Sequence, residues 1–410
     1  MPKPVRSPSP IRAWGATGGG FAGARRGAIR WSVELGPGRH QVDPKRLGHW
    51  YHLVPGCPLV RGDGVVVTDW HGVLRAHGAD GRLLWERDLV DDPEASWAEF
   101  WGRLLYIDEE HGAWVETRRG LCRVSADGEV RVVNAELRAG GFSPGVREIL
   151  PWGGFVRSYG TDENYWTRHW PCQSGVVELL DGEGRVRAAH PVGMAPERLY
   201  VVGARIAAFF HDENDQPPIR GTALVLGADG SLLERLEREQ GEAEVAWRRR
   251  VLSGVAVEQG LPGPLVGGNE HLWHEPPLVP APDGSCGYRA SPIWEETVRL
   301  LRFSRNGEQA EVLRDVSADP PAIDRDGVCY VTQVCDDRLQ LVAIEGDATR
   351  FACPLLDAPK LERYAYPHGG QPAKVWRQTR WFHSPAVLGP DGTTLVLTNL
   401  GEGCTLYCVA

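Results

Sequence analysis

The feature that most constrains the fold is a hairpin pattern that repeats along the chain. In the best-formed unit, residues 57–89, Asp63-Gly64 and Asp80-Gly81 each join two apolar runs. Asp-Gly between apolar runs is a strong hairpin signal, because Gly accepts a positive φ and Asp bonds its own backbone. The unit therefore predicts four antiparallel strands, at Pro58–Val60, Val65–Asp69, Val73–His77 and Leu83–Leu89.

The same turns recur through the rest of the sequence. Outer hairpins are expected at Asp127-Gly128, Asp181-Gly182, Asp229-Gly230, Asn306-Gly307 and, in a weaker form, Gly346-Asp347. Inner hairpins are expected at Asp283-Gly284, Asp326-Gly327 and Asp391-Gly392. Successive outer turns lie roughly 40–56 residues apart with one longer gap, close to the period of roughly 40–50 residues of four-stranded propeller blades. The 50 Gly, 31 Pro and 16 Trp residues suit many short strands and tight turns.

The two ends of the chain complement each other. The last unit, 383–410, has three predicted strands and stops where a fourth is due. Residues 27–35, GAIRWSVEL, match 81–89, GRLLWERDL, at Gly27/Gly81, Trp31/Trp85 and Leu35/Leu89. An N-terminal strand that completes the last unit would close a ring and remove two open sheet edges. We expect strand 28–35 to pair with the segment near 404–410.

These observations predict an all-β fold, a single seven-bladed β-propeller of four-stranded antiparallel blades closed by the N-terminal strand. An extended arm, 1–26, precedes the propeller, 27–410. The expected blades are 57–89, 99–137, 147–192, 197–240, 269–316, 317–355, and 377–410 together with 27–35. An insertion occupies 241–268. Charged and apolar residues at helical spacing in 233–252 predict a short surface helix, interpreted as a solvated lid.

The segment GVLRAHGADGRLLWERDL, residues 72–89, resembles the repeat of pyrroloquinoline-quinone-type propellers, a strand, an Asp-Gly turn and a strand carrying Trp. Other units replace the Trp by Val132, Glu234 or Phe351. The resemblance implies the fold across most of the chain. This repeat builds both quinoprotein dehydrogenases and non-enzymatic scaffolds. The quinone itself is not expected, because no set of residues that would bind calcium and the quinone is found. The quinone enzymes of this type also work in the periplasm and need a signal peptide, which is not seen in this sequence.

Charge and compartment narrow the function classes. The net charge is −9 and the Arg residues are scattered among acids, which argues against nucleic acid as a partner. The N-terminus lacks the apolar core of a secretory signal, and no segment is apolar enough to span a membrane. We expect a cytoplasmic protein, monomeric in isolation. The nine Cys residues are interpreted as small buried side chains; Cys404 and Cys408 share a strand face but lack two further ligands for zinc.

One candidate site follows from aligning the predicted innermost strands. HSPAVL (383–388), DPPAI (319–323) and EPPLV (275–279) superpose, which places His383, Asp319 and Glu275 at one mouth of the central channel. His52 and His274 belong to the same loops. One imidazole and two carboxylates could hold a divalent metal or act as an acid/base set. The alternative is an ordinary polar rim around a water-filled channel. No other cofactor is predicted.

A second candidate site is the segment YGTDENYWTRHWPCQSG, residues 159–175. It gathers five aromatic or basic residues typical of recognition hot spots, Tyr165, Trp166, Arg168, His169 and Trp170. The alternative is a loop that uses its aromatic side chains, Tyr159 included, to cover a blade edge.

The sequence contains no G-x-S-x-G, P-loop, dinucleotide, H-E-x-x-H or EF-hand motif. The favoured hypothesis is a non-enzymatic cytoplasmic scaffold that binds a protein. The competing hypothesis is an enzyme with a metal-assisted or acid/base site at the channel mouth. Sugar binding by repeated pockets is disfavoured, because the aromatic residues do not recur at one position in every unit.

Overall fold

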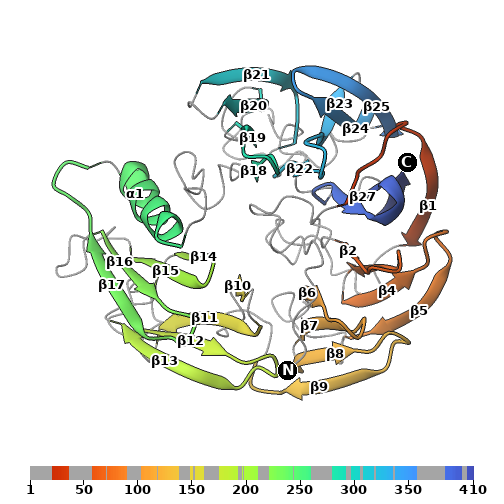
Figure 1. Ribbon diagram of the computed structural model, residues 1–410. Helices are drawn as coiled ribbons and strands as arrows, with labels where there is room; N and C mark the ends of the chain where they lie inside the picture. The colour runs from red at the N-terminus through yellow and green to blue at the C-terminus, as the bar shows by residue number, and fades with distance from the viewer. Residues whose placement is uncertain are drawn as a thin grey trace, which may run out of the picture.

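A computed structural model shows a ring of small sheets. It describes residues 21–36, 58–70, 72–89, 103–117, 119–137, 148–150, 153–160, 175–192, 196, 198–210, 221–242, 244–259, 279–291, 297–304, 308–317, 320–335, 338–357, 384–398 and 404–410. Within these ranges the strands form seven four-stranded antiparallel sheets, numbered here as blades 1 to 7. Figure 1 shows them arranged around a centre, with the first strand of each of blades 1 to 6 innermost.

Blades 1 to 6 each use four strands that are consecutive in sequence. Blades 1 to 3 are β2–β5 (Leu59–Val60, Val66–Trp70, Val73–His77, Leu83–Asp88), β6–β9 (Arg103–Ile107, Ala113–Thr117, Gly120–Val124, Val130–Asn134) and β10–β13 (Glu148–Ile149, Phe155–Gly160, Gly175–Leu180, Val186–Val192). Blades 4 to 6 are β14–β17 (Arg198–Val202, Arg205–Phe210, Thr222–Leu226, Leu232–Glu237), β18–β21 (Val279–Pro280, Cys286–Ala290, Arg299–Ser304, Gln309–Arg314) and β22–β25 (Ala322–Ile323, Cys329–Cys335, Arg338–Glu345, Ala348–Asp357).

Blade 7 joins the two ends of the chain. Its strands, from the centre outwards, are β26 (Val387–Gly389), β27 (Thr393–Thr398), β28 (Cys404–Val409) and β1 (Ile29–Gly36), with a single 3-10 turn at Pro390–Gly392. β1 pairs antiparallel with β28, and Trp31 lies opposite Cys408. The predicted closure is therefore confirmed, as is the fold class, a seven-bladed propeller. The four strands predicted within 57–89 are also present, shifted by at most one residue at each end.

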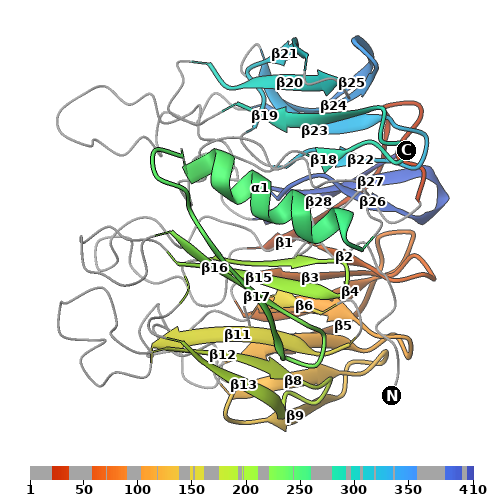
Figure 2. The ribbon, with the colours of Figure 1, turned by 60° about the vertical axis from the view of Figure 1, so that its left-hand side comes forward.

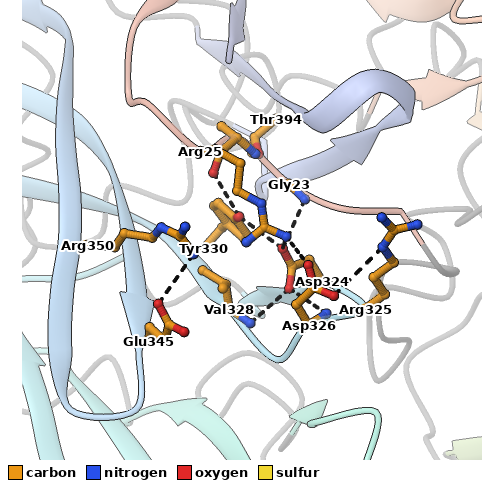
Figure 3. A network of polar contacts seen from close by, with 11 residues as sticks. Gly23, Arg25, Asp324, Arg325, Asp326, Val328, Tyr330, Glu345, Arg350 and Thr394 are labelled. Carbon is orange, nitrogen blue, oxygen red and sulfur yellow. Dashed lines mark hydrogen bonds and ion pairs between the residues drawn. The ribbon is translucent and has the colours of Figure 1, made fainter.

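A buried carboxylate ties the segment before β1 to blade 6 (Figure 3). Asp324, fully buried in the turn between β22 and β23, accepts hydrogen bonds at Oδ1 from the amides of Asp326 and Val328, at 2.9 Å each. Its Oδ2 accepts from the Gly23 amide at 3.0 Å and lies 3.2 Å from Arg25 Nη2. We call residues 21–28 the strap, because they cross blade 6 before entering the outer strand of blade 7.

Two further contacts hold the strap. The Tyr330 hydroxyl lies 3.0 Å from the Ala24 carbonyl and 3.1 Å from Asp324 Oδ2. The Ala24 amide donates to Thr394 Oγ1 of β27 at 3.1 Å. Gly23 is needed here, because a Cβ at that position would lie 2.3 Å from the Tyr330 ring. The strap is thus fixed to blades 6 and 7 before the strand pairing of β1 begins.

Buried apolar clusters join neighbouring blades around the ring, with one exception among the described residues. Clusters span blades 1 and 2, 2 and 3, 3 and 4, 5 and 6, 6 and 7, and 7 and 1. On the face of blade 4 that does not meet blade 3, the cluster is completed by helix α1, Glu244–Val257. Trp247, Val251 and Leu252 of the helix pack there, and Figures 1 and 2 show α1 standing between blades 4 and 5.

The helix predicted over 233–252 is therefore present only from residue 244 onward, and its predicted role is wrong. Leu232–Glu237 forms β17, because the turn at Asp229-Gly230 folds it back onto β16 and that pairing overrides the local helical spacing. The helix begins at Glu244, and its apolar side is buried, with Trp247 and Leu252 each 1% exposed. It is a packing element of the ring, not a solvated lid. In the described part of the chain no helix has the length and apolar character needed to cross a membrane.

Candidate functional site at the outer rim

The residues that the sequence singles out as candidate sites lie outside the described residues. These are Glu275, Asp319 and His383, with His52 and His274, at the predicted channel mouth, and Tyr165, Trp166, Arg168, His169 and Trp170 in the predicted binding loop. Both candidate sites therefore stay predictions. Within the described ranges no three His, Cys, Asp or Glu side chains are grouped so that they could hold a metal ion.

The strand topology does show to which end of the ring these segments are attached. In an antiparallel blade the innermost strand begins at the end where the second and third strands are joined. β18, β22 and β26 begin at that end, and so does the connection from β11 to β12 that contains 161–174. The two predicted sites are thus attached to the same end of the propeller, and the turns between third and fourth strands lie at the other.

Blade 1 holds two buried titratable groups whose pKa values are strongly shifted, Asp69 and His77. Burial raises the pKa of Asp69 to about 7, although a hydrogen bond with the Gly72 backbone and the charge of Arg75 both lower it. Burial, and then the nearby Arg75 charge, lowers the pKa of His77 to about 4. Arg75 itself donates to Glu86 at 2.7 Å. Because Asp69 is 7% and His77 1% exposed, these groups face the interior, and we assign them a structural role.

The outer rim carries a repeated arrangement that involves Trp31 and Trp85. Trp85 of β5 donates from Nε1 to the Ala126 carbonyl of blade 2 at 2.9 Å, and a Cβ on Gly128 would lie 2.9 Å from its ring. Trp31 of β1 donates to the Ala79 carbonyl of blade 1 at 2.8 Å, and a Cβ on Gly81 would also lie 2.9 Å from its ring. We call each such site a dock, an indole of one blade seated on the Ala-Asp-Gly turn of the next.

Strand register shows why these positions are equivalent. In the outer strands of blades 7 and 1, one residue forms a β-bulge near the start of the strand. The Trp that packs on the turn of the next blade comes directly after this bulge. Trp31 follows the bulge between Ile29 and Trp31, and Trp85 follows the one between Leu83 and Trp85. Phe351 of β25 occupies the same place, and a Cβ on Gly27 would lie 2.4 Å from its ring.

One dock lacks its aromatic side chain. The register of β13 places Ala188 after the bulge, where blades 1 and 7 have Trp. Ala188 faces Gly230 of blade 4, whose turn, Gly227-Ala228-Asp229-Gly230, repeats the Ala-Asp-Gly of the two filled docks. A Cβ on Gly230 would meet the Ala188 Cβ at 2.5 Å, and its next contacts are to Leu179. Gly230 has φ +84°, like Gly81 at +84° and Gly128 at +90°. The backbone of the dock is thus present without the indole.

The outer strands also expose aliphatic side chains. Seven large apolar residues of the described structure are at least 42% exposed. All of them lie on the outermost strands of five neighbouring blades, 7, 1, 2, 3 and 4: Ile29, Leu83, Leu84, Val132, Val186, Leu232 and Leu233. Contacts of other residues join these outer strands to the turns of the next blades. Asn134 Nδ2 donates to the Gly184 carbonyl at 2.8 Å, and Ala188 meets Gly230. We call this set the apolar band.

No protein-family model matches the chain, and no curated protein matches it. Among solved structures, it is similar to BamB from Moraxella catarrhalis, with 8% identity, 93% of this chain and 98% of that chain covered, and a TM-score of 0.40. It is also similar to the Pan2 WD40 domain from Neurospora crassa, with 8% identity, coverages of 93% and 96%, and a TM-score of 0.41. A gluconolactonase from Xanthomonas campestris shares 12% identity over 96% and 99% of the two chains, with a TM-score of 0.34.

These likenesses concern the β-propeller fold alone. The neighbours are scaffold-type propellers as well as enzymes, so they do not choose between the two classes. The assignment of the chain as a seven-bladed propeller rests on its own seven sheets and closing strand.

Sequence reasoning found Trp31 and Trp85 but missed Ala188. The available signal was the third Ala-Asp-Gly turn, Ala228-Asp229-Gly230, which lacks a Trp at the matching position of the preceding unit. The expected turn at Asp181-Gly182 hid this correspondence, because the glycine with positive φ is Gly184, which precedes Ala188 by four residues as Gly81 precedes Trp85.

Proposed function

We propose that the protein is a non-enzymatic, cytoplasmic scaffold that binds another protein through the outer wall of its ring. The observation that supports this proposal is the apolar band. Single exposed aliphatic residues are common on protein surfaces, but extended apolar surface is typical of interaction sites. Here every exposed large apolar residue of the described structure lies on an outer strand, and blades 5 and 6 contribute none.

The partner-binding experiment compares variants of the band. The purified chain, immobilised, is incubated with lysate of its own organism, and bound proteins are quantified and then re-tested as purified proteins. We expect a specific partner whose binding falls at least tenfold in Leu232→Asp/Leu233→Asp or Leu83→Asp/Leu84→Asp. Ala310→Asp, on the exposed outer strand of blade 5, is the matched control and should bind normally. A partner that binds all three variants equally would remove the band from the proposal.

The loop at 159–175 provides a separate arm of the same experiment. Trp166→Ala/Trp170→Ala should abolish capture of the partner and leave the melting temperature unchanged, if these aromatic side chains are recognition residues. A large loss of stability would instead assign them to covering the blade edge.

A second candidate function is an enzyme with a metal or acid/base site at the channel mouth. It is favoured by the finding that β18, β22 and β26, the innermost strands of three consecutive blades, all begin at one end of the ring. Metal content of the wild type and of His383→Ala tests it. One divalent ion per chain, lost in the variant, would support the site. Equal, sub-stoichiometric metal in both would end the metal hypothesis.

A further inference from the structure

We propose that Asp324, Asp326 and Tyr330 of blade 6, here called the arginine site, bind the peptide sequence Gly-Ala-Arg-x-Gly. The strap fills this site within the chain (Figure 3). The strap of a second copy of the chain fills it when two chains exchange their N-terminal segments. The inference is independent of the scaffold function proposed above. It is carried by a comparison with Asp108 of blade 2, a buried carboxylate of the same kind whose arginine comes from its own blade.

The turns of blades 2 and 6 hold the two carboxylates in the same way. Asp108 Oδ1 accepts hydrogen bonds from the amides two and four residues later, at 3.0 and 2.7 Å. Asp324 Oδ1 accepts from the amides at the same spacing, at 2.9 Å each. The aromatic residue six positions after the carboxylate reaches the other oxygen in both blades, Trp114 Nε1 at 2.9 Å and the Tyr330 hydroxyl at 3.1 Å. The two turns thus present the same acceptor, Oδ2, beside an aromatic side chain.

The arginine that completes each arrangement has a different origin. In blade 2 it is Arg123 of β8, which lies directly opposite the aromatic residue and places Nε 2.6 Å from Asp108 Oδ2. In blade 6 the residue opposite the aromatic side chain is Ala343, which is fully buried. Arg25 of the strap supplies the guanidinium instead, with Nη2 3.2 Å from Asp324 Oδ2. Blade 6 therefore binds an arginine that a segment outside the blade provides.

The strap is bound as a peptide and not as an added strand of blade 6. It contains no strand residue, and its backbone is held by single hydrogen bonds. The Phe21 carbonyl accepts from the Arg325 amide at 3.1 Å, and the Arg26 amide donates to the Ala410 carbonyl at 3.2 Å. Strand pairing accepts many sequences, whereas contacts of this kind depend on the side chains of the ligand.

The strap positions around the arginine define the sequence that the site accepts. A Cβ on Gly23 would lie 2.3 Å from the Tyr330 ring. A Cβ on Gly27, whose φ is +65°, would lie 2.4 Å from the Phe351 ring. Ala24 is 0% exposed, so a larger side chain would have to displace the packing around it. Together with the arginine, these three positions give the sequence Gly-Ala-Arg-x-Gly.

The charges around the site favour an arginine. Asp326 forms a second ion pair with Arg25, so two carboxylates of blade 6 contact the guanidinium. Arg325 offsets part of this charge, because its Nε lies 3.8 Å from Asp326 Oδ1. Arg350, the other arginine in Figure 3, is paired with Glu345 at 3.3 Å. Charge-assisted hydrogen bonds between a guanidinium and carboxylates are among the stronger contacts of a peptide with a protein.

The occupant in trans is a second copy of the chain, because the strap is the sequence that the site is seen to hold. The strap can leave blade 6 without breaking a strand pair of that blade. When two copies exchange the strap together with β1, each lost contact forms again between the chains, which makes such an exchange a low-cost route to a dimer. Within one chain the strap has a high effective concentration, so we expect exchange where the contact in cis has been weakened.

The first test adds the strap as a free peptide, residues 21–28 with blocked ends, to the full-length Arg25→Ala protein, whose own strap lacks the guanidinium. Binding is followed by fluorescence anisotropy of the labelled peptide. We expect saturable binding that Arg25→Ala or Gly23→Ala in the peptide weakens at least several-fold. Arg26→Ala in the peptide removes the same charge from an exposed position, and this matched control should bind like the unmodified peptide. If no peptide binds, or if the Arg25→Ala and Arg26→Ala peptides bind equally, the inference is overturned.

The second test mixes two full-length variants with complementary defects. Asp324→Asn keeps the strap and lacks the carboxylate, whereas Arg25→Ala keeps the carboxylate and lacks the guanidinium. The two chains, refolded together, should form dimers with one copy of each, detected by light scattering and native mass spectrometry, and each alone should stay monomeric. Asp108→Asn mixed with Arg25→Ala is the matched control and should form fewer dimers, because the Asp108→Asn strap is held by its own site. A mixture that stays monomeric, or equal dimer formation in both mixtures, would overturn the second copy as occupant.

Discussion

Replacing Asp324 by Asn should release the strap without unfolding a blade. The amide keeps one oxygen for the turn amides of Asp326 and Val328. In place of Oδ2 it presents an N–H₂ group to the Gly23 amide and to Arg25, both of which are donors. The variant therefore loses a charge-assisted hydrogen bond and an ion pair, and the Gly23 amide is left without an acceptor.

The size of the effect follows from these contacts. A hydrogen bond to a charged group contributes about 1.5–3 kcal/mol. The ion pair adds less, because the Arg25 side chain is 30% exposed and water screens it. We expect a loss of about 3 kcal/mol from the free energy that holds the strap. If the strap opens while the blades stay folded, a loss of this size raises the equilibrium constant for its opening about 100-fold.

Asp108 provides a matched control. It is 5% exposed in the corresponding turn of blade 2 and accepts from the Gly112 amide at 2.7 Å, from Trp114 Nε1 at 2.9 Å and from Arg123 Nε at 2.6 Å. Its partners all belong to one blade. Asp108→Asn should thus cost a similar free energy but leave the chain ends joined.

Hydrogen exchange resolved by segment separates the two variants. Asp324→Asn should accelerate exchange in residues 29–36 and 404–409 by up to about 100-fold. Asp108→Asn should accelerate exchange in blade 2 and leave β1 at the wild-type rate. If both variants exchange alike in β1, the contacts of Asp324 do not hold the closure and the reasoning fails.

Five further substitutions test other parts of the structure. Trp31→Ala should lower the unfolding free energy by about 2 kcal/mol and Trp85→Ala, more deeply buried, by about 3 kcal/mol, measured by denaturant titration; equal effects on both would contradict the burial argument. His77 is uncharged in the folded protein and its pKa is lowered, so its stabilisation is complete above pH 6.5 and is lost as pH falls towards 4; His77→Gln should flatten that part of the stability profile. The pKa of Asp69 is raised, so its contribution is complete below pH 3.8 and is lost as pH rises through 7; Asp69→Asn should become less destabilising, relative to wild type, between pH 5 and pH 8. Trp247→Ala should cost about 3 kcal/mol, because the indole is 1% exposed between α1 and blade 4; a change below 1 kcal/mol would show that α1 is dispensable to the ring.

The fold could be predicted because its determinants are local. Asp80-Gly81 and its counterparts specify hairpins by backbone conformation, and the observed φ of Gly81 and Gly230, both +84°, is what those turns require. The match of Trp31 with Trp85 carried the closure, because both indoles make the same long-range contact. These signals can be recognised even though the repeats differ in most of their residues, because each signal depends on only a few residues.

Helix α1 and the docking position at Ala188 could not be predicted, because they depend on contacts between different elements and not on local sequence. The segment LLERLE has helical spacing, and only its pairing with β16 makes it a strand. The start of α1 is set by packing of Trp247 on Phe209, a contact with 5.2 Å between ring centroids that spans two elements. The dock at Ala188 depends on a bulge whose position appears only in the register.

The aromatic docking contacts lie close to the junction of the two chain ends. Closing blade 7 brings together Ala24 and Thr394, which are 370 residues apart, and the entropy of closing such a loop costs about 5 kcal/mol beyond the constant term. The aromatic docks of Phe351 on Gly27, Trp31 on Gly81 and Trp85 on Gly128 lie on either side of this junction. They add aromatic packing between blades 6 and 7, blades 7 and 1, and blades 1 and 2.

On the far side of the ring the docking position loses its aromatic residue. There Ala188 of blade 3 takes the place of the indole and packs directly on Gly230 of blade 4. At Glu234 of blade 4 a dock is not needed at all, because α1 rather than the turn of a next blade packs against that sheet. Aromatic residues at the docking position are thus concentrated on the three interfaces from blade 6 to blade 2, around the closure, and a small side chain takes their place where blades 3 and 4 meet.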